Sequence, residues 1–239
     1  MTWFLGYMIF VGLILAGGYL LVARAMGQKA ASRNMGHVLP WLFVGFAIAF
    51  ATSLTGPWRQ SAWSVFYLLY IVSMGIWLLR WPLRKRRAGG LLLNAGRTWH
   101  NKILLWVGMA EVPIAVIMTW ISFAAMTNSV YASTTVAQFF LKAAFWWMIA
   151  GSIISLGLNK LELREHGLCF FYNVILWQRM KFYTWGTTHP NTLTIYIQPR
   201  FAFLPDSMSI RVPGVHRDTI DQIVQTHVPY SPPDSLVPS

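Results

Sequence analysis

The chain has 239 residues, of which 56% are hydrophobic and only 11% are charged. Soluble globular domains carry about twice that share of charged residues, so the composition excludes an ordinary soluble protein and indicates one buried largely in lipid. Nineteen Lys and Arg residues against seven Asp and Glu residues give a formal net charge of +12. A charge of that size suggests either a nucleic-acid partner or a strong bias in membrane topology.

Five apolar windows follow one another along the first two thirds of the sequence, and each has a length in the range of about 17 to 25 residues that is typical of transmembrane helices. They cover residues 3–23, 38–54, 63–79, 103–126 and 137–158. The first window lacks the basic residues that precede the apolar core of a signal peptide, and Arg24 follows it, so we expect a retained helix. The sequence therefore predicts a membrane α-helical bundle of five transmembrane helices over residues 1–158.

The basic residues lie on alternate loops between these windows. Three follow the first window and seven lie from Arg80 to Lys102, whereas the loops after the second and fourth windows hold only Arg59. By the positive-inside rule the N-terminus is outside and the C-terminal domain is cytoplasmic, in a bacterial inner or internal membrane. Because residues from 159 onward are nearly balanced in charge, the net charge reflects topology, and we expect no nucleic-acid partner.

Two charged residues lie inside the predicted spans. Glu111 is close to the midplane of the fourth window and two residues before Pro113, and an ionisable group at that depth is a functional hypothesis by default. Its other interpretation is a neutral, hydrogen-bonded packing residue. Lys142 lies near the outer end of the fifth window and can extend its amine to the surface. If that helix begins near Val130 instead, Lys142 and Glu111 share a level and can pair.

We expect no cofactor and no metal. No His lies inside a window, which argues against a haem held by two helices. His37 and His100 could face each other at the cytoplasmic edge, with Glu165 and His166 nearby, but no metal-ligand spacing accompanies them, so a metal there is a minor alternative. Cys169 is the only cysteine, and the apolar stretch 168–177 around it predicts a buried strand with a core cysteine.

The basic loop after the third window has two parts. Its first part is the run Arg84, Lys85, Arg86 and Arg87, which predicts contact with anionic lipid headgroups. Its second part, residues 89–99, has three leucines between glycines and predicts a segment that lies in the membrane interface.

From residue 159 the apolar spacing changes to that of strands. Leucines alternate with charged residues over 160–165, and alternation returns in 180–184, 193–197 and 208–212. After Pro213, a helix to about His227 carries Ile220, Ile223 and Val224 on one face. We therefore predict a small α+β domain over 159–228, an antiparallel sheet plus a C-terminal helix, and a disordered proline-rich tail over 229–239.

This C-terminal region resembles a group of small bacterial modules. The likeness is carried by a W-x-x-M-K-x-Y-x-W motif from Trp177 to Trp185, a TLTI strand, and a final V-P followed by a D-x-I-D-x-I helix. Over residues 158–228 these features resemble the PH-like domains attached to multi-pass membrane proteins, including a family of unknown function, DUF5673. The resemblance implies a scaffold that binds protein or lipid and has no catalytic residues.

These observations predict a non-enzymatic membrane scaffold, accessory subunit or assembly factor whose PH-like module binds a protein or a lipid headgroup. The expected partners are membrane lipids and another membrane protein. The predicted recognition surface combines cations with exposed aromatic side chains: Lys181, Arg200 and Arg211 with Tyr183, Tyr196 and Phe201. The alternative is a small transporter or intramembrane enzyme centred on Glu111. Since no convincing internal repeat is present, the scaffold is favoured.

Overall fold

The computed structural model describes residues 2–28, 30–32, 59–127, 136–187, 189–198 and 206–230. The chain forms two compact units. The central unit is Gly45–Leu176, and the terminal unit joins Met1–Val44 to Trp177–Ser239. We describe each unit by itself.

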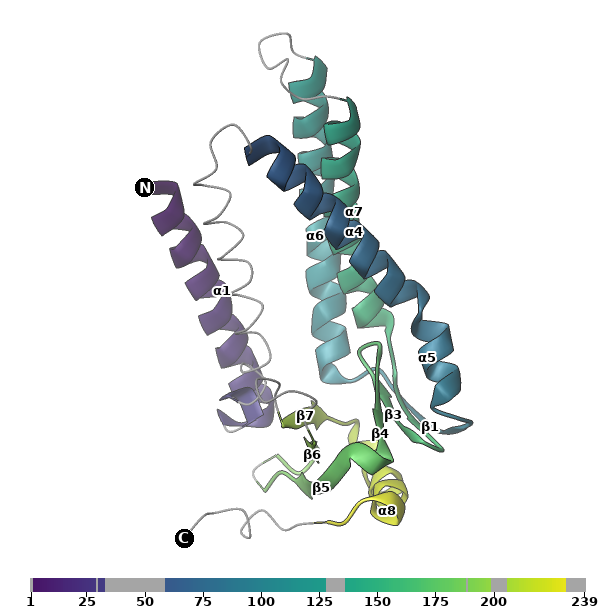
Figure 1. Cartoon of the computed structure of the whole chain (residues 1–239). Helices are drawn as coiled ribbons and strands as arrows, with labels where there is room; N and C mark the ends of the chain where they lie inside the picture. The colour runs from purple at the N-terminus through teal and green to yellow at the C-terminus, as the bar shows by residue number, and fades with distance from the viewer. Residues whose placement is uncertain are drawn as a thin grey trace. The chain divides into compact units, whose positions relative to one another are not determined.

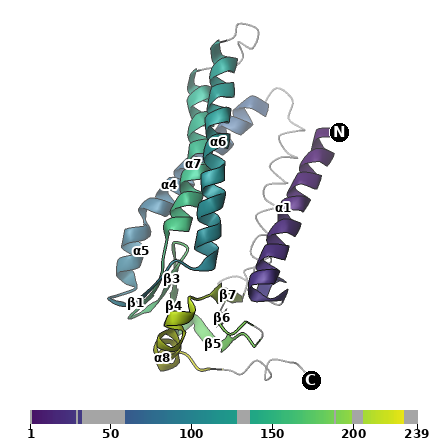
Figure 2. The ribbon, with the colours of Figure 1, turned by 180° about the vertical axis from the view of Figure 1, so that it is seen from behind.

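Long apolar helices dominate the central unit. They are α4 (Arg59–Leu79), the short α5 (Trp81–Arg87), α6 (Trp99–Thr127) and α7 (Val136–Leu158). Figures 1 and 2 show α6 and α7 side by side, with α4 crossing them obliquely. Within the described ranges, three helical segments are long and apolar enough to cross a membrane: Trp63–Arg87, Trp99–Thr127 and Val136–Leu158.

These helices confirm the third, fourth and fifth predicted windows as long apolar helices. The first window forms helix α1 (Thr2–Met26) in the terminal unit. The second window, residues 38–54, lies outside the described residues. Three potential spans are therefore established, and the number of five remains a prediction.

Helices α6 and α7 pack through small side chains spaced seven residues apart. A Cβ atom on Gly108 would lie 2.8 Å from the Ile154 nitrogen, and one on Gly157 would lie 2.5 Å from the Leu105 nitrogen. The buried residues at this spacing are Asn101, Gly108, Ala115 and Ser122 on α6, with Ala143, Ala150 and Gly157 on α7. Such spacing keeps one narrow seam in register along two helices and lets their backbones approach closely in lipid.

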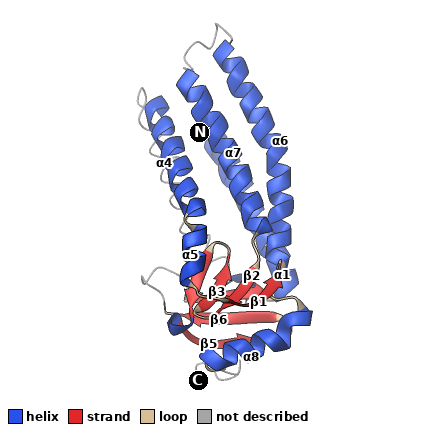
Figure 3. Ribbon diagram, turned by 90° about the vertical axis from the view of Figure 1, so that its right-hand side faces the viewer, coloured by secondary structure: helices blue, strands red, loops and turns tan. Residues whose placement is uncertain are grey.

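Four strands of the central unit form one antiparallel sheet. They are β1 (Leu91–Gly96), β2 (Leu161–Arg164), β3 (Gly167–Phe170) and β4 (Asn173–Leu176), in the order β1-β2-β3-β4. Figure 3 shows strands of this sheet gathered at one end of α6 and α7, which we call the sheet end. The sheet therefore contains a strand from the loop between two potential spans.

The structure adds to one sequence prediction about this sheet and contradicts another. The loop 89–99 was expected to lie in the membrane interface, which remains a prediction; it forms strand β1, in which Leu91 pairs with Arg164 and Gly96 with Leu161. The stretch 168–177 was expected to be one strand, but Phe171 and Tyr172 turn it into a hairpin. Both turn residues have positive φ, 49° and 58°, in the left-handed region that large side chains rarely adopt.

The terminal unit contains the second sheet. Its strands β5 (Met180–Trp185), β6 (Thr192–Ile197) and β7 (Ser207–Arg211) are antiparallel in the order β5-β6-β7. Two short 3-10 turns, Trp177–Arg179 and Gly214–His216, precede β5 and α8. Helix α8 (Arg217–His227) lies along this sheet in Figure 3, which confirms the predicted antiparallel strands and C-terminal helix.

Helix α8 covers the apolar face of this sheet. Leu193, Ile195 and Ile210 of the sheet are fully buried, as are Ile220 and Val224 of α8. Their spacing explains the arrangement, because residues two apart share a strand face and residues four apart share a helix face. The first residues of the predicted disordered tail are ordered: the Tyr183 N–H donates to the Pro229 carbonyl at 3.2 Å.

Candidate functional site

A buried carboxylate joins the sheet of the central unit to α5. Glu162 on β2 is only 7% exposed. Its Oε1 lies 2.5 Å from the Lys85 Nζ, and its Oε2 accepts from the Arg164 Nη2 at 2.9 Å and Nε at 3.1 Å. The Arg164 Nη1 also donates to the Gly89 carbonyl at 2.8 Å, beside the start of β1. We call Lys85, Glu162 and Arg164 the charge clasp.

The clasp divides the predicted headgroup-binding run into two pairs. Lys85 is paired with Glu162, and the Arg84 guanidinium donates to the Trp77 carbonyl and lies over the Trp77 ring. The Arg86 and Arg87 side chains are exposed. Half of the predicted lipid contacts are thus used within the protein, while the other half face outward.

The β3–β4 turn is the second contact between this sheet and the helices. The Tyr172 ring lies 5.3 Å from the Trp77 ring and 5.0 Å from the Trp81 ring, and its hydroxyl is hydrogen-bonded to that of Ser155. The Phe171 ring lies 6.3 Å from the His100 ring. A strained two-residue turn is retained only where surrounding contacts hold it, and here α4, α5, α6 and α7 supply those contacts.

Cys169 lies inside the same sheet, in register with Glu162. Its side chain is fully buried. Burial raises the pKa of the Cys169 thiol to about 11, although the nearby Arg164 charge acts in the opposite direction. The thiol is therefore protonated at neutral pH and unsuited to nucleophilic chemistry, in agreement with the predicted core cysteine.

In the terminal unit, Asp221 of α8 joins the helix to β5. One oxygen, Oδ1, accepts from the Tyr183 hydroxyl at 2.9 Å and from the Trp185 Nε1 at 2.7 Å. Arg217 lies 5.3 Å above the Trp185 ring. Burial, followed by the hydrogen bond to Asp221, raises the pKa of Tyr183. The aromatic motif and the D-x-I-D-x-I helix that carried the sequence resemblance thus fasten the helix to the sheet.

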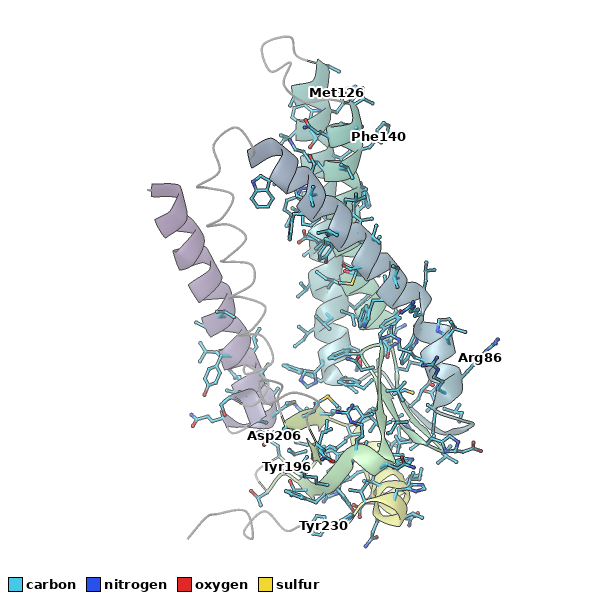
Figure 4. All side chains as sticks on the ribbon, viewed as in Figure 1. Arg86, Met126, Phe140, Tyr196, Asp206 and Tyr230 are labelled. Carbon is cyan, nitrogen blue, oxygen red and sulfur yellow. The ribbon has the colours of Figure 1, made fainter. Side chains whose placement is uncertain are left out.

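This arrangement corrects the predicted recognition surface. Tyr183 is 1% exposed and belongs to the core, where its hydroxyl donates a hydrogen bond to Asp221. Arg211 is half-buried, and its Nη1 donates to the Ala25 carbonyl of α1 at 3.0 Å. Lys181 is exposed. Tyr196, labelled in Figure 4, stacks on Phe182 with ring centroids 4.2 Å apart, while Arg200 and Phe201 lie outside the described residues.

Glu111 and Lys142 lie on different helices and at different levels. Contacts of α6 with α7 place Glu111 opposite the region of Gly151, about nine residues or roughly 13 Å along the helix from Lys142. These contacts, Gly108 with Ile154 and Gly157 with Leu105, therefore set a register in which the two charges are not level. No ion pair joins them among the described residues.

The described residues include no group of three or more His, Cys, Asp or Glu side chains placed to hold a metal, and His37 of the minor metal alternative lies outside them. A surface pocket on the α6–α7 pair is lined by Val116, Thr119, Trp120, Phe123, Phe139 and Trp147. Its wall is almost wholly apolar, which suits acyl chains better than reaction chemistry.

Comparison with known proteins confirms the predicted resemblance. Residues 159–229 match the family described as Domain of unknown function (DUF5673). The match begins before β2 and ends after α8, so it includes strands from both compact units. No curated protein and no solved structure matches the chain.

Proposed function

We propose that this protein is a non-enzymatic membrane scaffold, accessory subunit or assembly factor. Its apolar helices anchor it in a bacterial inner or internal membrane, and its PH-like module, on the cytoplasmic side, binds another membrane protein or a lipid headgroup. The main support for the proposal is that the polar side chains of the aromatic motif and of α8 form hydrogen bonds with one another inside the module. Asp221, Tyr183 and Trp185 bind one another and leave the outer face of α8 free for recognition.

The distribution of exposed residues on α8 supports this role. The helix buries Ile220 and Val224 against the sheet and exposes Asp218, Gln222 and Gln225. A rigid helix with a polar outer face provides recognition without reaction chemistry, since pre-organised surfaces lose little entropy on binding. The transporter or enzyme alternative rests on Glu111, which has no charged partner among the described residues.

A photocrosslinking experiment in cells tests the scaffold. A photoreactive amino acid at exposed Gln222 should give a discrete adduct with one membrane protein, whereas the same group at buried Thr194 should give none. Loss of the adduct on replacing neighbouring Gln225 by Arg would assign it to the α8 surface. Transport or turnover by the purified chain in vesicles, abolished by Glu111→Gln, would contradict the scaffold.

A further inference from the structure

The potential span Trp63–Arg87 ends in two cations whose side chains have no polar partner within the described residues. Arg86 and Arg87 are exposed at the end of α5, and no side-chain hydrogen bond or ion pair engages either one among the described residues. Figure 4 shows Arg86 directed away from α5. Their neighbour Lys85, by contrast, is fixed by Glu162.

Exposed leucines lie on either side of these arginines. Leu83 of α5 is 57% exposed, and Leu91 and Leu92 of β1 are 51% and 48% exposed. The clasp ties Lys85 of α5 and the Gly89 carbonyl to β2, with which β1 also pairs, so the five side chains belong to one braced segment. We call Leu83, Arg86, Arg87, Leu91 and Leu92 the basic elbow.

We propose that the basic elbow binds an anionic phospholipid of the adjoining leaflet, with the arginines on the phosphate and the leucines at the start of the acyl chains. Three observations support this ligand. Arg86 and Arg87 end the potential span Trp63–Arg87 and Leu91 and Leu92 follow it, which is where headgroup contact is expected along the chain. It combines free cations with exposed leucines, the pairing that suits the boundary between headgroups and chains.

The third observation is the local charge. Residues 80–102 hold seven basic and no acidic residues. The carboxylates folded against this segment are already engaged, Glu162 by the clasp and Glu165 by the Gly90 N–H at 2.8 Å. Arg86 and Arg87 thus have no ion-pair partner in the described part of the central unit, which favours an anionic ligand from outside the chain. This inference does not depend on the proposed scaffold function.

Lipid titration of the purified full chain tests the proposal. Detergent-solubilised protein is titrated with dioleoylphosphatidylglycerol or dioleoylphosphatidylcholine, and bound lipid is counted by native mass spectrometry. Each juxtamembrane cation contributes roughly fivefold to binding of an anionic surface, so Arg86→Gln with Arg87→Gln should lower phosphatidylglycerol affinity about 30-fold. The matched control, Arg97→Gln with Lys102→Gln, removes the same charge from exposed positions and should change it less than about threefold.

Two further arms distinguish the possible outcomes. Leu91→Gln with Leu92→Gln should weaken phosphatidylglycerol binding, and millimolar glycerophosphoglycerol should fail to displace the lipid, because the chains are part of the ligand. If the Arg86→Gln, Arg87→Gln variant and the control variant lose equal phosphatidylglycerol affinity, the attraction is a general effect of net charge and the proposal is overturned. So would displacement by the free headgroup, or phosphatidylcholine binding as tight as phosphatidylglycerol. An unchanged labelling rate of Cys169 verifies that each variant is folded.

Discussion

Removing Glu162 should open the sheet of the central unit. In Glu162→Ala, the Lys85 and Arg164 cations lose their shared partner. Their side chains are only 30% and 15% exposed, so water replaces the carboxylate incompletely. Deleting one member of a buried ion pair costs about 3–5 kcal/mol. Because the Lys85 amine is partly exposed and can reach water, we expect a smaller cost than this, about 2–3 kcal/mol of local opening free energy.

Cys169 provides the assay, since it is the chain's only cysteine and lies opposite Glu162 in the sheet. Burial keeps its pKa at about 11, so at pH 8 a maleimide reacts almost entirely through the opened state. At about 1.4 kcal/mol per tenfold change in the opening equilibrium, Glu162→Ala should label roughly 30 to 150 times faster than the unaltered chain.

The control for this prediction is Glu165→Ala, which removes the same charge from an exposed position of the adjoining turn. The hydrogen bond that it loses from the Gly90 N–H is exposed, and labelling should rise less than about fivefold. If Glu162→Ala labels no faster than Glu165→Ala, then the clasp does not hold the sheet together and the reasoning is refuted.

Three other substitutions test separate parts of the molecule. Gly157→Val should destabilise the α6–α7 pair by several kcal/mol in a steric-trap unfolding measurement, whereas Gly151→Val, where a Cβ meets nothing within 4 Å, should be nearly neutral. Tyr183→Phe should lower thermal stability by about 0.5–1.5 kcal/mol through loss of the bond to Asp221; an unchanged melting temperature would contradict that role. Glu111→Gln should leave cellular protein level and function unchanged, and loss of function at a normal level would revive the transporter or enzyme alternative.

The features that were predicted correctly depend on residues that are close together in the sequence. Spans were recognisable because length and apolarity are local properties. Strands β5, β6 and β7 followed from two-residue alternation, and α8 from the spacing of Ile220 and Val224. The contact between α6 and α7 was not predicted, because it follows a seven-residue spacing through Gly157 and leaves Gly151 of the same helix exposed.

Features that depend on distant residues were missed. Strand β1 pairs with a partner about 70 residues later, and its leucine run has neither strand nor helix periodicity. The β3–β4 hairpin was hidden because its turn is Phe171–Tyr172, and neither residue is a usual left-handed turn former. Lys85 looked equivalent to Arg86 in the sequence, and only the folded position of Glu162 separates a structural cation from a free one.

Strand β1 adds to the sheet of the matched family region from outside that region. The match starts at residue 159, yet β2 pairs on one edge with β1, which lies more than 60 residues earlier. Without β1, the Leu161–Arg164 edge would present unpaired backbone groups, the situation that leads strands to join other chains. A fragment beginning at residue 159 should therefore self-associate, while one that retains residues 81–97 through a short linker to 159 should stay monomeric in size-exclusion chromatography. Equal behaviour of the two fragments would mean that the β2 edge needs no cover, and that β1 serves only to brace the basic elbow.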